Sequence, residues 1–382
     1  VAQVKIGKPM KVDEPRQDAN FVKGTHERLR QAVWTALQEG RRKQDRELSE
    51  REAAAIEQAV WKQHLEQHES LRQYASSMDS LASGLWETAE RCAASLDGNA
   101  ASKRSSDAAS ENRYDWVECA CREWFGIANG ADAGVTQRRS GMQLACAKDA
   151  RAAACRQNRP GDAQQAHQEE DTEAKSLQGA EMSCASVPLR LLDVGSNNNY
   201  LGRNRSRFAS LFHVTAMDIA PAHESVVQAD FLSVLVEEDA EVDVTQSRGA
   251  GEGAVRTTLR AGSFDVVLFS LLLSYLPTTR MRYQSCKQAK RLLKPNGLFL
   301  VFDPDSNCHL KSVQWMKDWK AAIEGLGFKR WRYRKAAHMH CMAFRAIDTA
   351  LEGNRDGDYL CSGDHVLMHI PQDRLSGSEA VG

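Results

Sequence analysis

The sequence has no excess of charge of either sign. Its 50 lysine and arginine residues oppose 51 aspartate and glutamate residues, which gives a formal net charge of -1 at pH 7. A chain balanced in this way has no overall electrostatic attraction to nucleic acid or to an anionic membrane. Any contact with either must therefore be local.

Long apolar runs and export signals are also lacking. The longest apolar candidate, around Phe264 to Leu276, contains Asp265 and two serines, and it is shorter than the roughly 18 residues that indicate a membrane-spanning helix. The segment after Val1 shows no charged stretch followed by an apolar one, so we expect neither a secretory signal nor a membrane partner. The ten cysteines are scattered along the chain. This distribution indicates reduced thiols and a cytoplasmic location.

The composition changes twice along the chain. Apolar residues three and four apart, with little glycine and no proline, predict a small helical domain at 25–126. Residues 127–187 have too little apolar periodicity to offset the entropy of ordering and are predicted to be a disordered linker. We place a methyltransferase-like α/β domain, argued below, at 188–372. The ends, 1–24 and 373–382, are expected to be disordered tails.

The predicted α/β domain alternates short apolar runs with helical patterns. Runs that are nearly continuous in Val, Ile, Leu and Phe suit strands buried on both faces of a parallel sheet. We expect strands at 189–194, 214–218, 226–229, 264–269 and 298–302, and helices at 203–212, 279–293 and 312–326. This pattern predicts a Rossmann-like, doubly wound and mostly parallel sheet. Residues 237–262 are acidic and aperiodic, and we expect them to form a mobile insertion.

A glycine turn follows the first predicted strand. The segment from Leu191 to Ser196 turns at Gly195 and leads toward a helix. At this position an open α/β sheet presents backbone N–H groups to a ligand. We therefore predict ligand contacts from Asp193, Gly195 and Ser196.

Two more carboxylates follow the next two strands. Asp218 ends the second predicted strand, 23 residues after Gly195, where a carboxylate can accept hydrogen bonds from both hydroxyls of an adenosine ribose. Ile219 follows it directly. Asp230, after the third strand, is placed to accept a hydrogen bond from the adenine amino group while Phe231 packs on the base. These positions together predict a nucleoside site.

The missing glycines indicate which nucleoside is bound. A dinucleotide fingerprint needs two further glycines so that backbone and helix can close on a pyrophosphate, but Asn197 and Tyr200 stand at those positions. No GxxxxGK[ST] run is present, which excludes a P-loop. S-adenosylmethionine carries no phosphate and tolerates side chains in this turn, so it is the predicted ligand, with S-adenosylhomocysteine as a competitor. A nicotinamide-dependent reductase is a less favoured alternative.

Several sequence blocks carry a family resemblance. They are found at 191–196, 230–232, 269–275, 325–330, 338–340 and 370–373, with a weaker one at 116–125. Together with the turn at 292–297 before an apolar strand, they resemble the class I methyltransferases. More closely, they resemble the S-adenosylmethionine sensors that act upstream of the TOR growth kinase (the SAMTOR family), which are related to a ribosomal RNA adenine methyltransferase.

The resemblance implies a seven-stranded sheet and a ligand that is sensed rather than consumed. By analogy with the family, the ligand-free protein engages the GATOR and KICSTOR assemblies and restrains TOR signalling, and S-adenosylmethionine releases it. Such a switch requires the ligand to contact two states of the protein differently. We therefore expect the helical residues Arg113, Tyr114 and Trp116 to approach the ligand, and Ser270 to contribute from the sheet.

Catalysis is left open by the sequence. Amino-methylating enzymes commonly follow the fourth strand with a D/N-P-P-F/Y/W turn, but here the run from Ser270 to Leu273 supplies neither a carboxylate nor an amide. We therefore assign no catalytic residue. Asp303 to Asp305, after the fifth strand, is interpreted as a turn. The alternative function is an active methyltransferase, perhaps on RNA adenine, gripping its substrate with the basic run 329–335.

The remaining motifs have plainer interpretations. Alternation within 329–335 fits a half-exposed strand. His338 and His340 lack neighbouring thiolates or carboxylates at ligand spacing, and Cys119 and Cys121 point to different faces of a helix. We expect no metal site.

Overall fold

The computed structural model describes nine stretches of the chain. They are residues 14–82, 113–127, 141–143, 188–238, 244–248, 255–305, 309–336, 339–347 and 368–374. Most of the predicted linker and of the two predicted tails lies outside them.

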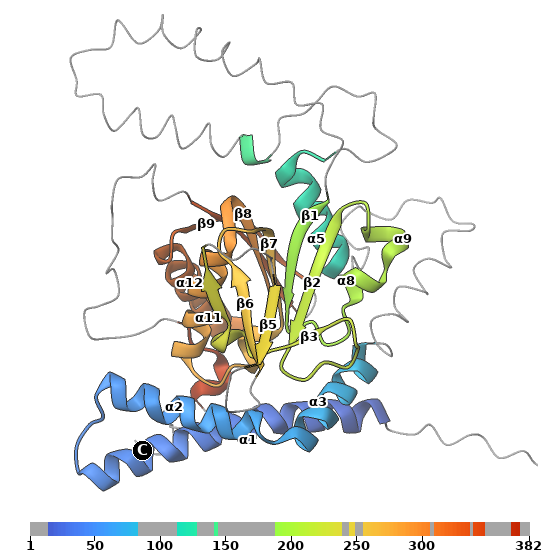
Figure 1. Cartoon of the computed structure of the whole chain (residues 1–382). Coiled ribbons are helices and arrows are strands. Elements are labelled where there is room, and N and C mark those ends of the chain that lie inside the picture. Colours follow the sequence, from blue (N-terminus) through green and yellow to red (C-terminus); the bar gives the residue numbers. More distant parts are fainter. Residues whose placement is uncertain are drawn as a thin grey trace, which may run out of the picture.

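A seven-stranded sheet forms the centre of the molecule (Figure 1). Its strands are β1 (Leu189–Val194), β2 (Phe212–Asp218), β3 (Val227–Gln228), β7 (Phe264–Ser270), β8 (Leu293–Pro304), β9 (Phe328–Lys335) and β10 (Met339–Ala346). The order across the sheet is β3-β2-β1-β7-β8-β10-β9. Only β10 runs antiparallel to its neighbours among these pairs. The predicted doubly wound, mostly parallel sheet is confirmed.

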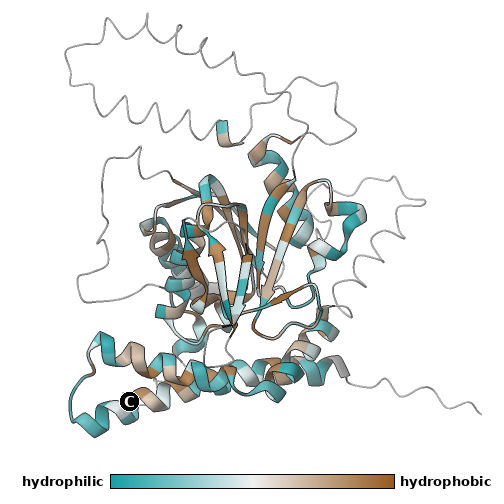
Figure 2. Ribbon diagram, viewed as in Figure 1, coloured by the Kyte–Doolittle hydropathy of each residue, from teal (hydrophilic) through white to brown (hydrophobic). Residues whose placement is uncertain are grey.

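Both faces of the sheet are covered by helices. Consecutive strand residues alternate between two cores, as the pleat requires: Leu191 belongs to one and Leu192 to the other. One core contains side chains of α11 (Thr279–Leu292) and α12 (His309–Gly325). The other contains those of α5 (Arg113–Phe125), α8 (Tyr200–Arg203) and α9 (Arg205–Phe208). Hydrophobic residues accordingly predominate on the central strands (Figure 2).

Three N-terminal helices lie across one end of the sheet, at the bottom of Figure 1. They are α1 (Glu14–Gln44), α2 (Glu50–Leu65) and α3 (His68–Leu81). A capping box between Ser49 and Glu52 starts α2. We call these three helices the cover.

The predicted helical domain is therefore not one bundle. Helix α5 packs on a face of the sheet, whereas the cover lies at the sheet's end. The prediction failed because α5 has apolar side chains around most of its circumference, which sequence periodicity cannot assign to a particular neighbour. In addition, α1 begins at Glu14, within the segment 1–24 that was expected to be disordered.

Two other segments differ from the expected structure. Within 237–262, β5 (Val244–Arg248) and β6 (Val255–Arg260) pair with β4 (Leu235–Glu237) in a three-stranded sheet, so the prediction of an irregular segment is wrong there. The strands were missed because they are short and half exposed, which weakens the alternation of apolar and polar residues. The helix expected at 203–212 is instead α8 and α9, each a single turn, and the next strand already starts at Phe212.

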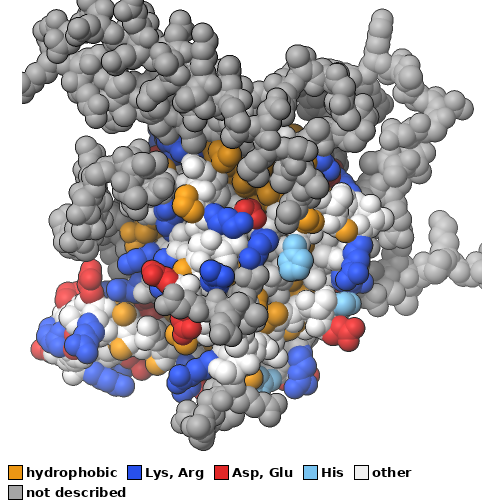
Figure 3. Space-filling model, turned by 45° about the horizontal axis from the view of Figure 1, so that its top comes forward, with side chains coloured by type: hydrophobic (Ala, Val, Ile, Leu, Met, Phe, Trp, Pro, Cys, Tyr) orange, Lys and Arg blue, Asp and Glu red, His pale blue; other side chains and the backbone are white. Residues whose placement is uncertain are grey.

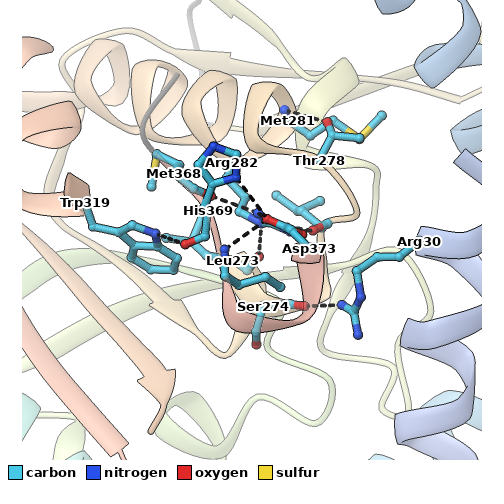
Figure 4. Close-up of polar contacts among 12 residues, drawn as sticks. Arg30, Leu273, Ser274, Thr278, Met281, Arg282, Trp319, Met368, His369 and Asp373 are labelled. Atoms are coloured by element: carbon cyan, nitrogen blue, oxygen red, sulfur yellow. Dashed lines mark hydrogen bonds and ion pairs between the residues drawn. The ribbon is translucent and has the colours of Figure 1, made fainter. Parts of the chain in front are cut away.

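One buried arginine joins three parts of the chain (Figure 4). Arg282 is fully buried, and its guanidinium donates to the carbonyl oxygens of Leu273, Leu276 and Met368 at 2.8–3.1 Å. It also forms a two-bonded ion pair with Asp373, at 2.6 and 2.9 Å. The C-terminal stretch thus anchors the loop that follows β7. Asp373 had been assigned to the disordered tail, and that boundary is wrong.

Asp373→Ala should lower the free energy of unfolding by about 3 kcal/mol, because it leaves a buried guanidinium without its counter-ion. Chemical denaturation of the variant measures this loss. Glu123→Ala is the matched control: it removes the exposed ion pair with Arg332, and the cost there should stay below about 1 kcal/mol. Equal costs at the two sites would contradict the role given to Arg282.

Candidate functional site

A cavity of about 220 Å³ lies between the carboxyl ends of the strands and the cover. The ends of β1, β2 and β7 supply one side of it, and α1, α2 and α3 supply the other. Its lining includes Gly195, Asn197, Asp218, Ile219, Asp230, Phe231, Ser270, Leu271, Leu272, Tyr275 and Pro304 from the α/β part, and Val22, His26, Trp61, Tyr74 and Met78 from the cover. This volume is below the roughly 300 Å³ at which small-molecule sites usually begin.

The turn after β1 has an unusual backbone. Gly195 has a φ of 77°, and Asn197 and Asn199 also lie in the left-handed region, at 49° and 53°. Asparagine tolerates that region better than other residues with a side chain, which explains how the turn forms without the glycines of a dinucleotide fingerprint. The Asn197 side chain donates to the Ala75 carbonyl at 3.3 Å, and Asn198 donates to Asp79 at 2.8 Å. The turn is therefore tied to α3.

The turn after β7 is strained. Leu271 has a φ of 65°, an outlier for a bulky residue. Its backbone N–H donates to the Phe302 carbonyl at 3.0 Å, which helps to hold this conformation. Strain of this kind concentrates at ligand sites, and Leu271 lines the cavity.

Asp218 ends β2 beside the cavity. Its carboxylate accepts backbone N–H bonds from Asn197 at 3.0 Å and from Ala220 at 2.9 Å. Burial nevertheless raises its pKa to about 6. Asp230 accepts from the Leu232 backbone at 3.1 Å and from the Trp61 indole at 3.2 Å.

Two buried polar atoms near the first turn have no hydrogen-bond partner among the described residues. They are Asp193 Oδ1 and Ser270 Oγ. The other oxygen of Asp193 accepts from the Ser196 hydroxyl at 2.7 Å, and burial raises the Asp193 pKa to about 6. Buried polar atoms of this kind normally have a partner, so a polar ligand group fits here.

The cover contributes a cluster of aromatic side chains with polar tips. His64 and Tyr275 share a hydrogen bond of 2.6 Å, and His26 and Tyr74 share one of 2.9 Å. The Tyr275 ring lies 5.2 Å from that of Tyr74 and 6.0 Å from that of Trp61, centroid to centroid. Burial lowers the pKa of both histidines to about 4, aided at His26 by the charge of Arg30.

The structure brings six of the eleven predicted ligand residues to the cavity: Gly195, Asp218, Ile219, Asp230, Phe231 and Ser270. Asp193 and Ser196 lie directly behind its first turn. The sequence analysis missed the residues of the cover because Trp61 fitted an ordinary apolar stripe. The signal was present, since polar-tipped aromatics and histidines share the inward side of α1 to α3.

The three residues predicted from α5 do not line the cavity. Tyr114 stacks on Tyr200, with ring centroids 4.2 Å apart, and Trp116 packs on Phe302. Arg113 lies over the Tyr114 ring, and its charge opposes the rise in the Asp193 pKa. Helix α5 therefore supports the sheet behind the first turn.

Asp303 is a further carboxylate at this edge. The segment read as a turn belongs to β8, which extends to Pro304, because β10 pairs with it up to that residue. Burial raises the Asp303 pKa to about 7, and Oδ1 has no hydrogen-bond partner in the described part of the chain. The neighbouring Pro304 lines the cavity.

The other motifs have structural roles. The basic run forms β9, where Arg332 pairs with Glu123 and Lys335 with Asp305. His340 bonds Asp305 and Tyr333. Lys and Arg are interspersed with acidic and uncharged side chains on the face shown in Figure 3.

Metal and membrane features were sought in the same stretches. No cluster of three or more potential metal ligands was found in the described stretches. Within these stretches, no helix combines the length and apolar character needed to cross a bilayer.

Comparison with known proteins identifies the family. A family model described as a methyltransferase domain matches residues 142–353. Curated relatives from Danio rerio and Xenopus tropicalis, each named S-adenosylmethionine sensor upstream of mTORC1, are both 32% identical over 326 residues. The alignments cover 82% of this chain and 70% of the fish protein, and 85% and 71% for the frog protein. The chain belongs to this family of S-adenosylmethionine sensors upstream of mTORC1.

A solved structure gives a weaker match. A putative sarcosine dimethylglycine methyltransferase from Galdieria sulphuraria is 13% identical, with a TM-score of 0.29, over 47% of this chain and 85% of that one. In this member of the sensor family, the methyltransferase-like α/β part therefore rests on the family model and on the observed sheet.

Acid should weaken the contact between the cover and the sheet edge. The His64 pKa, about 4 in the fold against an ordinary 6.5, means that protonation favours the unfolded state. The stabilisation is complete above pH 6.5 and is lost as pH falls, by about 1.4 kcal/mol per pH unit. The nearby carboxyls with raised pKa act in the opposite direction, but they are common to wild type and variant.

The difference in unfolding free energy between wild type and His64→Gln isolates this effect. Urea melts at pH 7 and pH 5 should show the wild type losing roughly 2 kcal/mol relative to the variant. A difference that is the same at both pH values would contradict burial of a neutral His64.

Proposed function

We propose that the chain binds S-adenosylmethionine in the cavity between the sheet edge and the cover. The observation that carries the proposal is the pair of carboxylates, Asp218 and Asp230, at the ends of neighbouring strands on one cavity. Asp218 would hold the ribose hydroxyls and Asp230 the adenine amino group. Ile219 and Phe231 would pack against the base.

The methionine part of the ligand would lie near the first turn. Asp193 and Ser270 offer the buried atoms without partners described above, and Gly195 and Ser196 belong to the same turn. A ligand ammonium or carboxylate would satisfy these atoms. S-adenosylhomocysteine carries the same groups and would compete.

We further propose that the protein senses this ligand rather than consuming it. Its family membership supports this, as does the cover, because a ligand held between two parts of a chain can shift their equilibrium. In the ligand-free state the protein would engage GATOR and KICSTOR and restrain TOR signalling in the cytoplasm, and S-adenosylmethionine would release it. Purified GATOR and KICSTOR should be captured by the full chain, and the ligand should reduce that capture.

Asp303 supports methyl transfer as a second candidate function. A carboxyl group with a pKa of about 7 beside the cavity is suited to accept a proton at neutral pH. Incubation with methyl-labelled S-adenosylmethionine and total RNA or protein distinguishes the two functions. Label in a macromolecule, lost in Asp303→Asn, would establish the second.

Asp218→Ala should weaken S-adenosylmethionine binding by roughly tenfold or more, because hydrogen bonds to a charged group are lost. Isothermal titration calorimetry measures this change. Asp265→Ala is the control: that carboxylate binds Arg190 and Lys294 at the other end of β7, and its removal should leave affinity unchanged. Full affinity in Asp218→Ala would place the nucleoside elsewhere.

A further inference from the structure

Trp61 of the cover occupies the same carboxylate that the proposed function gives to the adenine amino group. Its indole N–H donates to Asp230 Oδ2 at 3.2 Å, while Oδ1 accepts from the Leu232 backbone. Both oxygens are thus engaged. Trp61 is 6% exposed, so water offers its N–H little alternative.

The surroundings hold Trp61 in this position. Its ring makes an edge contact with Tyr275 and a tilted one with His64, at centroid distances of 6.0 and 5.6 Å. These same rings narrow the cavity to about 220 Å³. A ligand of the size of S-adenosylmethionine needs more room than this, and displacing the Trp61 side chain would provide it.

We infer that Trp61 is an intramolecular competitor of the ligand, and that binding of S-adenosylmethionine replaces the Trp61–Asp230 hydrogen bond. This inference rests on the proposed function and adds the contact that changes between the two states. A ligand that must break an existing bond binds with the difference between the two interactions, so Trp61 sets the concentration at which the site fills.

Helix α2 carries the change away from the site. Glu57 lies one turn before Trp61 and accepts from the Thr278 hydroxyl at 3.1 Å, with Arg280 at 3.4 Å. Both partners belong to the start of α11, next to the loop that lines the cavity. Release of Trp61 would therefore loosen α2 from the sheet edge and alter the outer surface of the cover.

Trp61→Phe tests the inference, because it removes the competing donor and keeps an aromatic ring. Titration calorimetry with S-adenosylmethionine should show a Kd about tenfold lower than in the wild type. In the Asp230→Ala background the same substitution should have no effect, because the shared acceptor is gone. Trp124→Phe is the matched control: it removes a buried indole N–H that donates to the Asn296 carbonyl at 2.9 Å, and it should leave the Kd unchanged.

An unchanged or higher Kd in Trp61→Phe would overturn the inference. Absence of binding to the wild type would instead reject the proposed function. Should Trp61→Phe fail to fold, indole N–H exchange in the wild-type protein provides the test by NMR. One slowly exchanging indole resonance should become fast-exchanging when S-adenosylmethionine is added, and protection that stays the same at every indole would overturn the inference.

Discussion

The functional edge of this protein depends on how buried polar groups find partners where the parallel strands end. Asp193, Asp218, Asp230 and Asp303 all lie at that edge, and burial raises the pKa of each of them. Burying carboxylates is costly unless donors are at hand. The turns after the strands supply backbone N–H groups, and the cover supplies the Trp61 indole. The position of the cover and the chemistry of the site are therefore one problem.

This constraint gives sensing a physical basis. Polar-tipped side chains of the cover approach the sheet edge as partners that a ligand can replace, whereas an aliphatic interface would offer nothing to exchange. The loop after β7 is the fixed element of the site, because the fully buried Arg282 holds it to the C-terminal stretch. A rigid loop facing a replaceable cover is an arrangement in which binding moves one part and leaves the other in place.

Much of the sheet and half of the site were predictable from sequence. Buried parallel strands have a strong local signal, and β1 was predicted residue for residue. Asp218 and Asp230 were predictable because their distance from the first turn follows from strand order. The cover was not, because the packing of α2 on the sheet edge is a contact between residues 169 positions apart, such as Trp61 and Asp230. For the same reason the division between α5 and the other helices was missed: both have apolar faces, and periodicity does not say what a face packs against.

Hydrogen exchange of the full chain, with and without S-adenosylmethionine, tests the central claim most directly. The account places the ligand between the strand ends and the cover, so exchange should change in α1 to α3 and in the turns after β1 and β7, while α5 and β9 stay as they were. Altered exchange at the strand ends with an unaffected cover would contradict it, because the ligand would then bind the sheet alone.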